Sequence, residues 1–266
     1  QANALIQVEA KKNDMLGFSD IGSMLGKESP SATEIELIKS RRNIGAAVDN
    51  LKLDIKVEPN YFPLIGEFMA RRFKPDAENS VATPLFGMNS FAWGGEQLKL
   101  AEFELPQELL GKELTLVSGE QGSFTLLDDD DNVLVNGEVG QAIDENGLKL
   151  QVEALQANPG TTFSVVRSPR LTTILNYQKV LDVSERGKES GMVGLALEST
   201  EPATAIQILN EIARLYVQQN IERTSAEAAQ SLGFLKDQLP QVRKDLEKAE
   251  NALNAFQIRS KSIDIS

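Results

Sequence analysis

The spacing of apolar residues near the C-terminus constrains the fold of this chain more than any other feature. From residue 228 onward they recur at alternating steps of four and three, a heptad pattern with charged residues at other positions. Pro240 lies inside the pattern, and an interior proline costs a helix about 3 kcal/mol. The repeat nevertheless keeps its phase, which predicts a kinked but continuous helix that needs a packing partner. The nine residues, here called the heptad seam, are Ala228, Leu232, Leu235, Leu239, Val242, Leu246, Ala249, Leu253 and Phe256.

The N-terminal part of the chain has the pattern strand, helix, strand. Residues 4–9 predict a short strand, and Ser31 with Glu34 forms a capping box that predicts the start of a helix. Residues 51–58 alternate between apolar and polar side chains for eight residues, which is typical of a half-buried strand. This part of the sequence therefore predicts an α/β unit.

The same α/β pattern returns near residue 168. Ser168 as N-cap followed by Pro169 predicts a helix that runs to about residue 179. Residues 180–184 and 192–198 then predict a pair of strands, and the long C-terminal helix is expected to start at Thr200.

Between these two parts the period of the hydrophobic pattern changes to two. Short strands are separated by Gly, Pro, Asn or a cluster of Asp, at an even spacing that predicts a small β-sandwich or jelly roll. The predicted strands are 98–105, 113–118, 123–128, 132–136, 148–155 and 161–166. The overall prediction is an α+β fold with three parts: an α/β domain from residues 1–62 and 168–224, a β-rich module inserted at 63–167, and the start of a coiled-coil arm at 225–266.

The composition excludes several kinds of chemistry. The 266 residues include no Cys and no His, so disulfides, thiolate nucleophiles, Ser-His-Asp triads and His- or Cys-ligated metals are ruled out. The net charge of -12 repels phosphate backbones, so no nucleic-acid partner is expected. No stretch approaches the ~20 apolar residues that span a bilayer. We expect no catalytic residues, cofactor or metal in this chain.

The acidic run Asp128–Asp131 is the most conspicuous candidate for a metal site. Counted from Asp128, however, positions six and twelve of an EF-hand loop would be Val133 and Val139, instead of Gly and Glu. A solvated hairpin turn is the prediction here. Nothing in the spacing of the other carboxylates selects a glycosidase-like pair.

Several segments resemble a known family. Residues 4–9, 34–41 and 48–55 resemble the chain-length-determinant (Wzz-type) domain. A closer resemblance is to the periplasmic region of Wzc-like bacterial tyrosine autokinases. It is carried by Tyr61-Phe-Pro-Leu-Ile-Gly66, Ala70-Arg-Arg-Phe73 and Phe91-Ala-Trp-Gly-Gly95, while residues 232–240 and 248–256 resemble that family's entry into a coiled coil.

This resemblance implies a Wzz-type α/β domain on the periplasmic side of a Gram-negative inner membrane, with transmembrane helices outside this chain. It implies a homo-oligomeric ring, a polysaccharide co-polymerase, that takes part in polymerisation, chain-length control and export of capsule or exopolysaccharide. The implied partners are a polysaccharide polymerase, an outer-membrane export channel and the nascent polysaccharide. The ATP-binding kinase domain and the helix that pairs with the heptad seam would both lie beyond Ser266, so we interpret the chain as part of a larger protein.

A second hypothesis comes from a different class. Jelly rolls often bind sugars, so the β-insert could be a carbohydrate-binding or carbohydrate-processing module with Trp93 as its stacking platform. Titration with oligosaccharides while following Trp93 fluorescence separates the two hypotheses.

Overall fold

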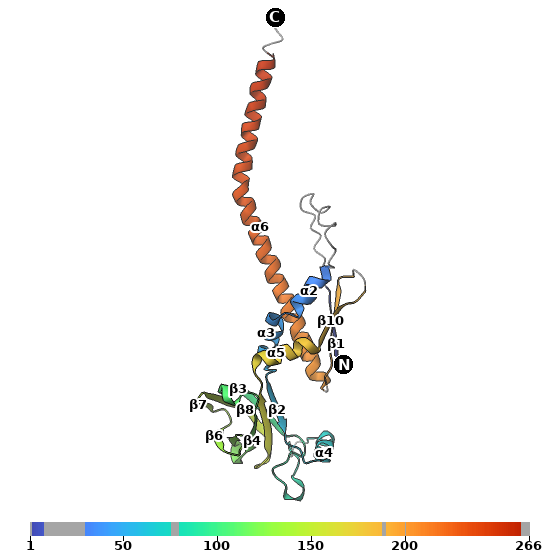
Figure 1. The fold of residues 1–266 in the computed structure, drawn as a ribbon, viewed down its shortest axis with the longest axis vertical. Coiled ribbons are helices and arrows are strands. Elements are labelled where there is room, and N and C mark those ends of the chain that lie inside the picture. The colour runs from blue at the N-terminus through green and yellow to red at the C-terminus, as the bar shows by residue number, and fades with distance from the viewer. Residues whose placement is uncertain (1, 8–29, 76–79, 188–189, 200, 262–266) are drawn as a thin grey trace. The chain divides into compact units, whose positions relative to one another are not determined.

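The computed structural model describes residues 2–7, 30–75, 80–187, 190–199 and 201–261 (Figure 1). The chain divides into two compact units, Gln1–Ile212 and Ala213–Ser266, which are described separately. Helices and strands are both well represented, so the predicted α+β class is confirmed.

A small antiparallel sheet brings the first strand beside two late ones. Its order is β1 (Ala2–Gln7), β11 (Met192–Leu197) and β10 (Leu181–Glu185), with Ala2 opposite Leu197. The predicted pairing of β10 with β11 is confirmed. β11 is almost entirely buried, as expected for the central strand of a covered sheet.

The helix predicted from Ser31 is in fact two helices, α2 (Pro30–Ile38) and α3 (Arg41–Leu51). Ser40 breaks it, because its backbone is extended and its hydroxyl accepts a hydrogen bond from the backbone N–H of Asn43 at 3.3 Å. The buried side-chain amide of Asn43 also donates to the carbonyl of Ile38 at 3.0 Å, which satisfies the end of α2. α2 begins at Pro30, one residue before the predicted N-cap.

The strand predicted for residues 51–58 is wrong in its first half. α3 continues through Leu51, and Lys52 closes it in the left-handed conformation (φ 51°), so β2 begins only at Ile55 and ends at Pro59. The apolar-polar alternation of residues 51–54 belongs to a helix end and a turn, which period counting does not distinguish from a strand.

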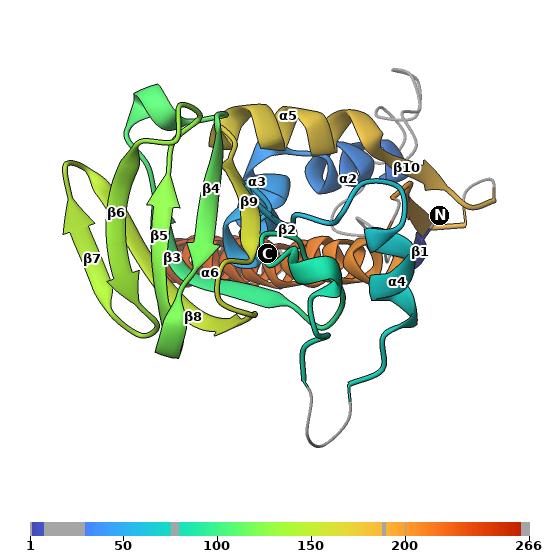
Figure 2. The same ribbon diagram turned by 90° about the horizontal axis from the view of Figure 1, so that it is seen from below.

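Two antiparallel sheets make up the middle of the chain (Figure 2). The five-stranded sheet has the order β2-β9-β4-β5-β6 and the three-stranded sheet the order β3-β8-β7. Their strands are β3 (Gln97–Glu104), β4 (Glu113–Ser118), β5 (Ser123–Leu127), β6 (Val133–Glu138), β7 (Ala142–Glu145), β8 (Leu148–Gln156) and β9 (Thr162–Arg167). All six strands predicted in this region are present, and the four-residue β7 was not predicted.

One hydrophobic cluster joins the two sheets. Phe103 and Leu150 enter it from the three-stranded sheet, and Leu116, Phe124 and Phe163 from the five-stranded sheet. β4, β5, β9 and the first half of β8 bury alternate residues, so the core lies between the sheets. We call residues 55–167 the β-module.

Short helices connect these elements. α4 (Gly66–Arg72) and the 3-10 turn η1 (Leu85–Gly87) follow β2, while η2 (Gln107–Leu109) and η3 (Glu120–Gly122) lie between later strands. α5 (Arg170–Val180) follows β9 and packs against α3. Its N-cap is Pro169, one residue after the predicted one, and this cap makes no side-chain hydrogen bond.

The long helix α6 (Pro202–Lys261) is continuous through Pro240, as predicted. Its first turns belong to the first unit, where Ala205, Ile208, Leu209 and Ile212 are buried. From Ala213 onward the helix is the second unit. Among the described residues, no helix is both long and apolar enough to cross a membrane.

Candidate functional site

Two of the family motifs meet at one end of the β-module. Tyr61 forms an isolated parallel bridge with Ala92, and the backbone N–H of Ala92 donates to the carbonyl of Asn60 at 2.8 Å. The segments 61–66 and 91–95 therefore lie side by side, although about thirty residues separate them along the chain.

Aromatic rings fill the space between these motifs. The ring of Phe62 stacks on Trp93, with 5.5 Å between centroids and 16° between planes, and meets Phe91 edge-on at 5.3 Å. The indole N–H of Trp93 donates to the carbonyl of Met88 at 3.2 Å. Trp93 is only 2% exposed. The expected sugar-stacking platform is therefore not available at Trp93, because the protein itself occupies its face and its N–H.

A buried carboxylate holds the loop that follows Trp93. The two oxygens of Glu96 accept the backbone N–H groups of Trp93 at 2.8 Å and of Gly94 at 2.7 Å, and Glu96 is 7% exposed. These charge-assisted bonds satisfy two donors that the turn leaves without a ladder partner. Glu96 was not singled out from the sequence, and its place directly after Gly94-Gly95 is the signal that could have identified it.

The two glycines let a third motif approach. A Cβ on Gly94, whose φ is +143°, would lie 2.4 Å from Cβ of Phe73, so only glycine leaves room for that ring. Phe73 closes the segment Ala70–Phe73, so all three motifs converge on one structural junction.

A cleft of about 940 Å³ runs beside this junction and is lined by Tyr61, Glu67, Arg71, Glu201 and Thr204, among others. Burial is the main cause that raises the pKa of Tyr61 above its usual value of 10, with help from the charge of Glu96. Tyr61 is therefore a neutral phenol at physiological pH, and its environment does not activate it as a nucleophile or base.

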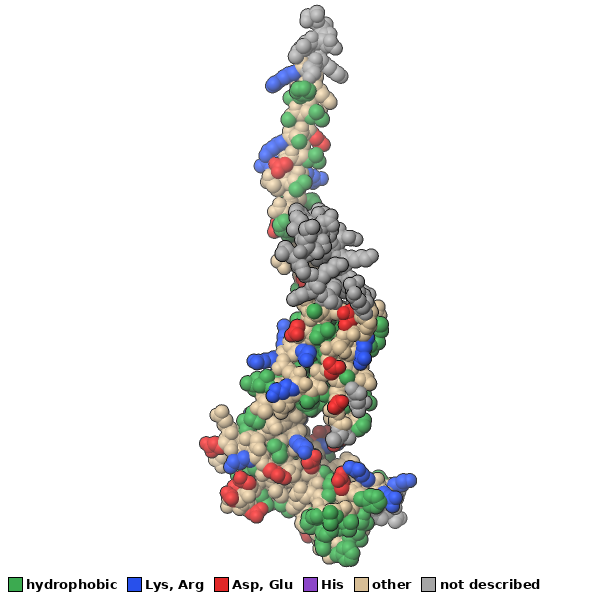
Figure 3. Space-filling view, turned by 45° about the vertical axis from the view of Figure 1, so that its right-hand side comes forward, with side chains coloured by type: hydrophobic (Ala, Val, Ile, Leu, Met, Phe, Trp, Pro, Cys, Tyr) green, Lys and Arg blue, Asp and Glu red, His purple; other side chains and the backbone are tan. Residues whose placement is uncertain are grey.

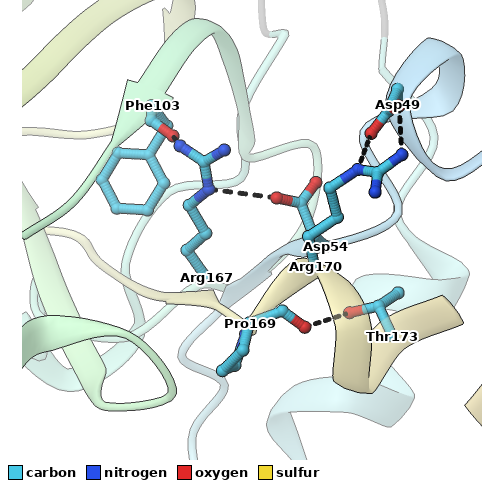
Figure 4. Close-up of polar contacts among 7 residues, drawn as sticks. All are labelled: Asp49, Asp54, Phe103, Arg167, Pro169, Arg170 and Thr173. Atoms are coloured by element: carbon cyan, nitrogen blue, oxygen red, sulfur yellow. Dashed lines mark hydrogen bonds and ion pairs between the residues drawn. The ribbon is translucent and has the colours of Figure 1, made fainter. Parts of the chain in front are cut away.

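A second polar cluster joins the β-module to the helices (Figure 4). Arg167, the last residue of β9, donates from Nε to Asp54 at 3.0 Å and also bonds the carbonyl of Phe103. Arg170 in α5 forms a bidentate pair with Asp49 at 2.6 and 2.7 Å, and this hydrogen bonding lowers the pKa of Asp49. Both pairs join residues more than 110 positions apart, and no sequence pattern pointed to them.

The acidic run forms the predicted hairpin turn between β5 and β6. One oxygen of Asp128 accepts the backbone N–H groups of Asp130 at 2.9 Å and Asn132 at 2.8 Å, and hydrogen bonds from Asn132 are the main cause that lowers the pKa of Asp128. Within the described part of the chain, no group of three or more acidic side chains is placed to hold a metal ion.

The heptad seam lies on a single uninterrupted helix, and all nine of its residues are exposed. Leu239, Val242 and Phe256 are each more than 60% exposed. The spacing and the helix agree with the prediction, while the partner expected for the seam stays a prediction.

Comparison with known proteins gives a consistent result. Residues 55–168 match the family described as "Tyrosine-protein kinase Wzc, N-terminal domain". The putative tyrosine-protein kinase EpsB of Ralstonia nicotianae is 36% identical over 271 residues, covering 100% of this chain and 36% of that protein. The tyrosine-protein kinases etk of Escherichia coli K12 and wzc of Salmonella typhimurium are each 37% identical, covering 100% and 99% of this chain and 34% of each relative.

Among solved structures, Xanthomonas campestris FlgL aligns with 79% of this chain and 53% of its own, at a TM-score of 0.23 and 12% identity, a score too low to indicate a shared fold. This chain spans about a third of the length of the curated relatives named above. Their similarity nevertheless extends over essentially all of its residues, including the three motifs that converge on Phe73 and Trp93. Over its whole length the chain is therefore a Wzc-like sequence, as those motifs indicated.

Proposed function

We propose that this chain is the periplasmic assembly and scaffold region of an inner-membrane polysaccharide co-polymerase. In this role it takes part in polymerisation, chain-length control and export of capsule or exopolysaccharide. The observation that carries the proposal is the alignment of the whole chain with EpsB, etk and wzc. In keeping with such a role, the buried carboxylates of Glu96 and Asp54 are explained by structural hydrogen bonds.

The kinase activity that the relatives' names state is proposed to reside in a part of the parent protein outside this chain. The sequence has no Walker A motif to cradle a nucleotide phosphate, and it has only three Tyr. We therefore expect the isolated chain neither to bind ATP nor to phosphorylate tyrosine. Its partners would be further copies of itself in a ring, a polysaccharide polymerase, an outer-membrane export channel and the nascent polymer.

The proposed organisation is a discontinuous Wzz-type α/β domain (1–62 and 168–224), an inserted β-sandwich module (63–167) and a coiled-coil arm that starts at 225. In this division β2 (Ile55–Pro59) belongs by sequence to the α/β domain and by hydrogen bonding to the five-stranded sheet of the β-module. The two antiparallel sheets that share one core support a sandwich for the insert. The exposed heptad seam supports the arm, because fully burying each Leu or Val of the seam would contribute about 1.5–3 kcal/mol. In the parent protein, a returning helix would supply the partner.

The test uses the full-length parent protein in a bacterium that lacks its own copy of the gene. The variant Leu239→Asp/Leu246→Asp, here called the seam variant, places two charges in the seam, where burial costs several kcal/mol. The matched control is Gln230→Asp/Asn251→Asp, which adds the same charge on the opposite face of α6, two residues before Leu232 and Leu253 in the heptad. Polymer length is read on gels of extracted polysaccharide, at protein levels matched by immunoblot.

We expect the seam variant to shorten or abolish the polymer and the control to leave its length distribution unchanged. Wild-type polymer from the seam variant would contradict the arm's part in assembly. Wild-type polymer from a strain without any copy of the gene would contradict the proposed function as a whole.

A further inference from the structure

The β-module carries an exposed apolar surface that its own core does not need. Its members are large hydrophobic residues on α4, on η1 and in the segments beside them, and we call them the apolar tip. They are Leu64, Ile65, Phe68, Met69, Phe86 and Met88. Figure 3 shows hydrophobic side chains gathered on the surface of the first unit, with basic side chains beside them. Contiguous exposed apolar patches of this kind mark interaction sites, whereas apolar residues exposed singly do not.

The two segments of the tip belong to one surface. Phe68 and Met69 of α4 line a single apolar hollow together with Leu85 of η1. The second segment is held in place from below, because the N–H of Ala82 donates to the carbonyl of Gly94 at 2.8 Å and Trp93 binds the carbonyl of Met88. The apolar tip is therefore anchored to the packed residues around Trp93 and Gly94.

The most exposed side chains of the tip sit where the backbone turns outward. Leu64 is fully exposed with φ at 71°, and Phe86 is 84% exposed with φ at 55°. Residues other than Gly rarely adopt this left-handed backbone conformation, and Asn adopts it more easily than Leu or Phe. Each of the two residues combines an unfavourable backbone conformation with the exposure of an apolar side chain to water. Transfer of that side chain from water to an apolar environment outside the protein would offset the cost.

The charge around the tip differs from that of the rest of the chain. Residues 80–95 contain no charged side chain, whereas a quarter of the whole chain is charged. Within residues 61–75, the basic residues Arg71, Arg72 and Lys74 outnumber the one acid, Glu67, in a chain whose net charge is -12. Two further acids, Glu58 and Glu201, line the cleft that Glu67 and Arg71 also line. Arg71 pairs with Glu67, and the guanidinium of Arg72 lies over the ring of Phe68, 4.6 Å from its centroid. The acids that follow, Asp76 and Glu78, lie outside the described residues.

We propose that the apolar tip docks on the surface of a lipid bilayer that carries anionic headgroups. Leu64 and Phe86 enter the boundary between headgroups and acyl chains, while Arg72 and Lys74 stay at the level of the phosphates. Fully exposed apolar side chains flanked by Arg and Lys suit an interface that is fluid and anionic, where long basic side chains reach the headgroups. This contact is separate from any membrane-spanning segment, and it does not depend on the assembly role proposed above.

The test is flotation of the 266-residue chain with vesicles of phosphatidylethanolamine and phosphatidylglycerol at 3:1, and with vesicles of phosphatidylcholine alone. The seam variant serves as the background throughout, because the exposed heptad seam could itself bind lipid. In that background, Leu64→Asp/Phe86→Asp, here called the tip variant, is compared with Val133→Asp/Leu171→Asp. This control places the same charge at two apolar residues of β6 and α5 that are 57% and 55% exposed. Trp93 fluorescence, and the midpoint of urea unfolding that it reports, verify that each variant is folded.

We expect the background and its matched control to float with the anionic vesicles and the tip variant to bind at least tenfold more weakly, because each apolar side chain that leaves water is worth about tenfold in affinity. Arg72→Gln/Lys74→Gln should weaken binding to anionic vesicles by about fivefold per charge and leave the weaker binding to phosphatidylcholine unchanged. The proposal would be overturned if the tip variant floated with the vesicles as well as the control does. It would also be overturned if the background protein floated with neither kind of vesicle. If that background protein instead self-associates and the tip substitutions abolish the association, the tip is a protein interface and the lipid assignment is wrong.

Discussion

The two ion pairs at the base of the β-module should differ greatly in their effect on stability, in the opposite order to their hydrogen-bond lengths. The bidentate Arg170–Asp49 pair has the shorter distances, 2.6 and 2.7 Å against 3.0 Å for Arg167–Asp54. Its side chains are 56% and 50% exposed, whereas those of Arg167 and Asp54 are 26% and 10% exposed. We predict that Arg167→Met is strongly destabilising and Arg170→Met nearly neutral.

The magnitudes follow from burial. Arg167→Met leaves the carboxylate of Asp54 buried without its partner; this costs 3–5 kcal/mol when both groups are fully buried, so about 2 kcal/mol where the arginine is partly exposed. The carbonyl of Phe103 loses its donor as well, for about 1 kcal/mol more. The exposed pair of Arg170 is worth at most about 1 kcal/mol, since solvent screens it. Methionine retains most of the apolar stem in both variants.

Urea unfolding followed by Trp93 fluorescence measures the unit that contains both pairs. With a slope of about 2–3 kcal/mol per molar urea, Arg167→Met should lower the midpoint by roughly 1 M and Arg170→Met by less than about 0.5 M. In a background of Asp54→Asn, which removes the buried charge, the penalty for Arg167→Met should shrink by at least half. Equal penalties for the two arginines, or no coupling between Arg167→Met and Asp54→Asn, would refute the reasoning from burial.

Three further outcomes are expected. Gly94→Ala should destabilise the first unit by about 2–4 kcal/mol in the same urea assay, because the new methyl meets Phe73 and φ is positive; a change below about 0.5 kcal/mol would contradict the packing described. The pKa of Asp49 is lowered in the folded protein by its hydrogen bond from Arg170. The pair therefore contributes under about 1 kcal/mol to the free energy of unfolding at pH values above the unfolded pKa of about 3.9, and this contribution is lost as the pH falls through the lower pKa of the folded state. Asp49→Asn should therefore remove a small part of the acid-induced loss of unfolding free energy between about pH 5 and 2, and identical pH profiles for the two proteins would count against the pair. Sedimentation of the 266-residue chain should show concentration-dependent self-association that the seam variant weakens, and a strict monomer at high concentration would argue against a recruited partner.

How well the sequence predicted each element depended on whether its pattern is local. All six predicted strands of the β-module and the continuous long helix rest on periodicity that the chain itself displays, and both are present in the structure. The errors occurred where two local signals compete. Residues 51–54 alternate like a strand but lie at a helix end, and Ser40 interrupts an apolar stripe that would suit a longer helix.

The candidate site was predictable only in part, for a related reason. The three motifs near Tyr61, Phe73 and Trp93 stand out in the sequence through their resemblance to a family, but their convergence is a property of the tertiary structure. An indole in a turn-rich segment was interpreted as a sugar platform, and only the stacking of Phe62 on it reveals a buried role. The carboxylate of Asp54 is one of 39 acids, and nothing in its neighbours indicates that Arg167 will cover it.

The boundaries of the β-module have a physical explanation in the strands that bound it. β2 enters the module and β9 leaves it as antiparallel neighbours, with Ile55 opposite Arg167, and the N–H of Ser168 donates to the carbonyl of Asp54 at 2.7 Å. The matched family segment, residues 55–168, begins and ends at this same crossing. Because the ends of the module meet, its core can form without rearranging the helices on the other side of the crossing. The Arg167–Asp54 pair lies at that crossing, so it ties the last residue of β9 to the turn that leads into β2.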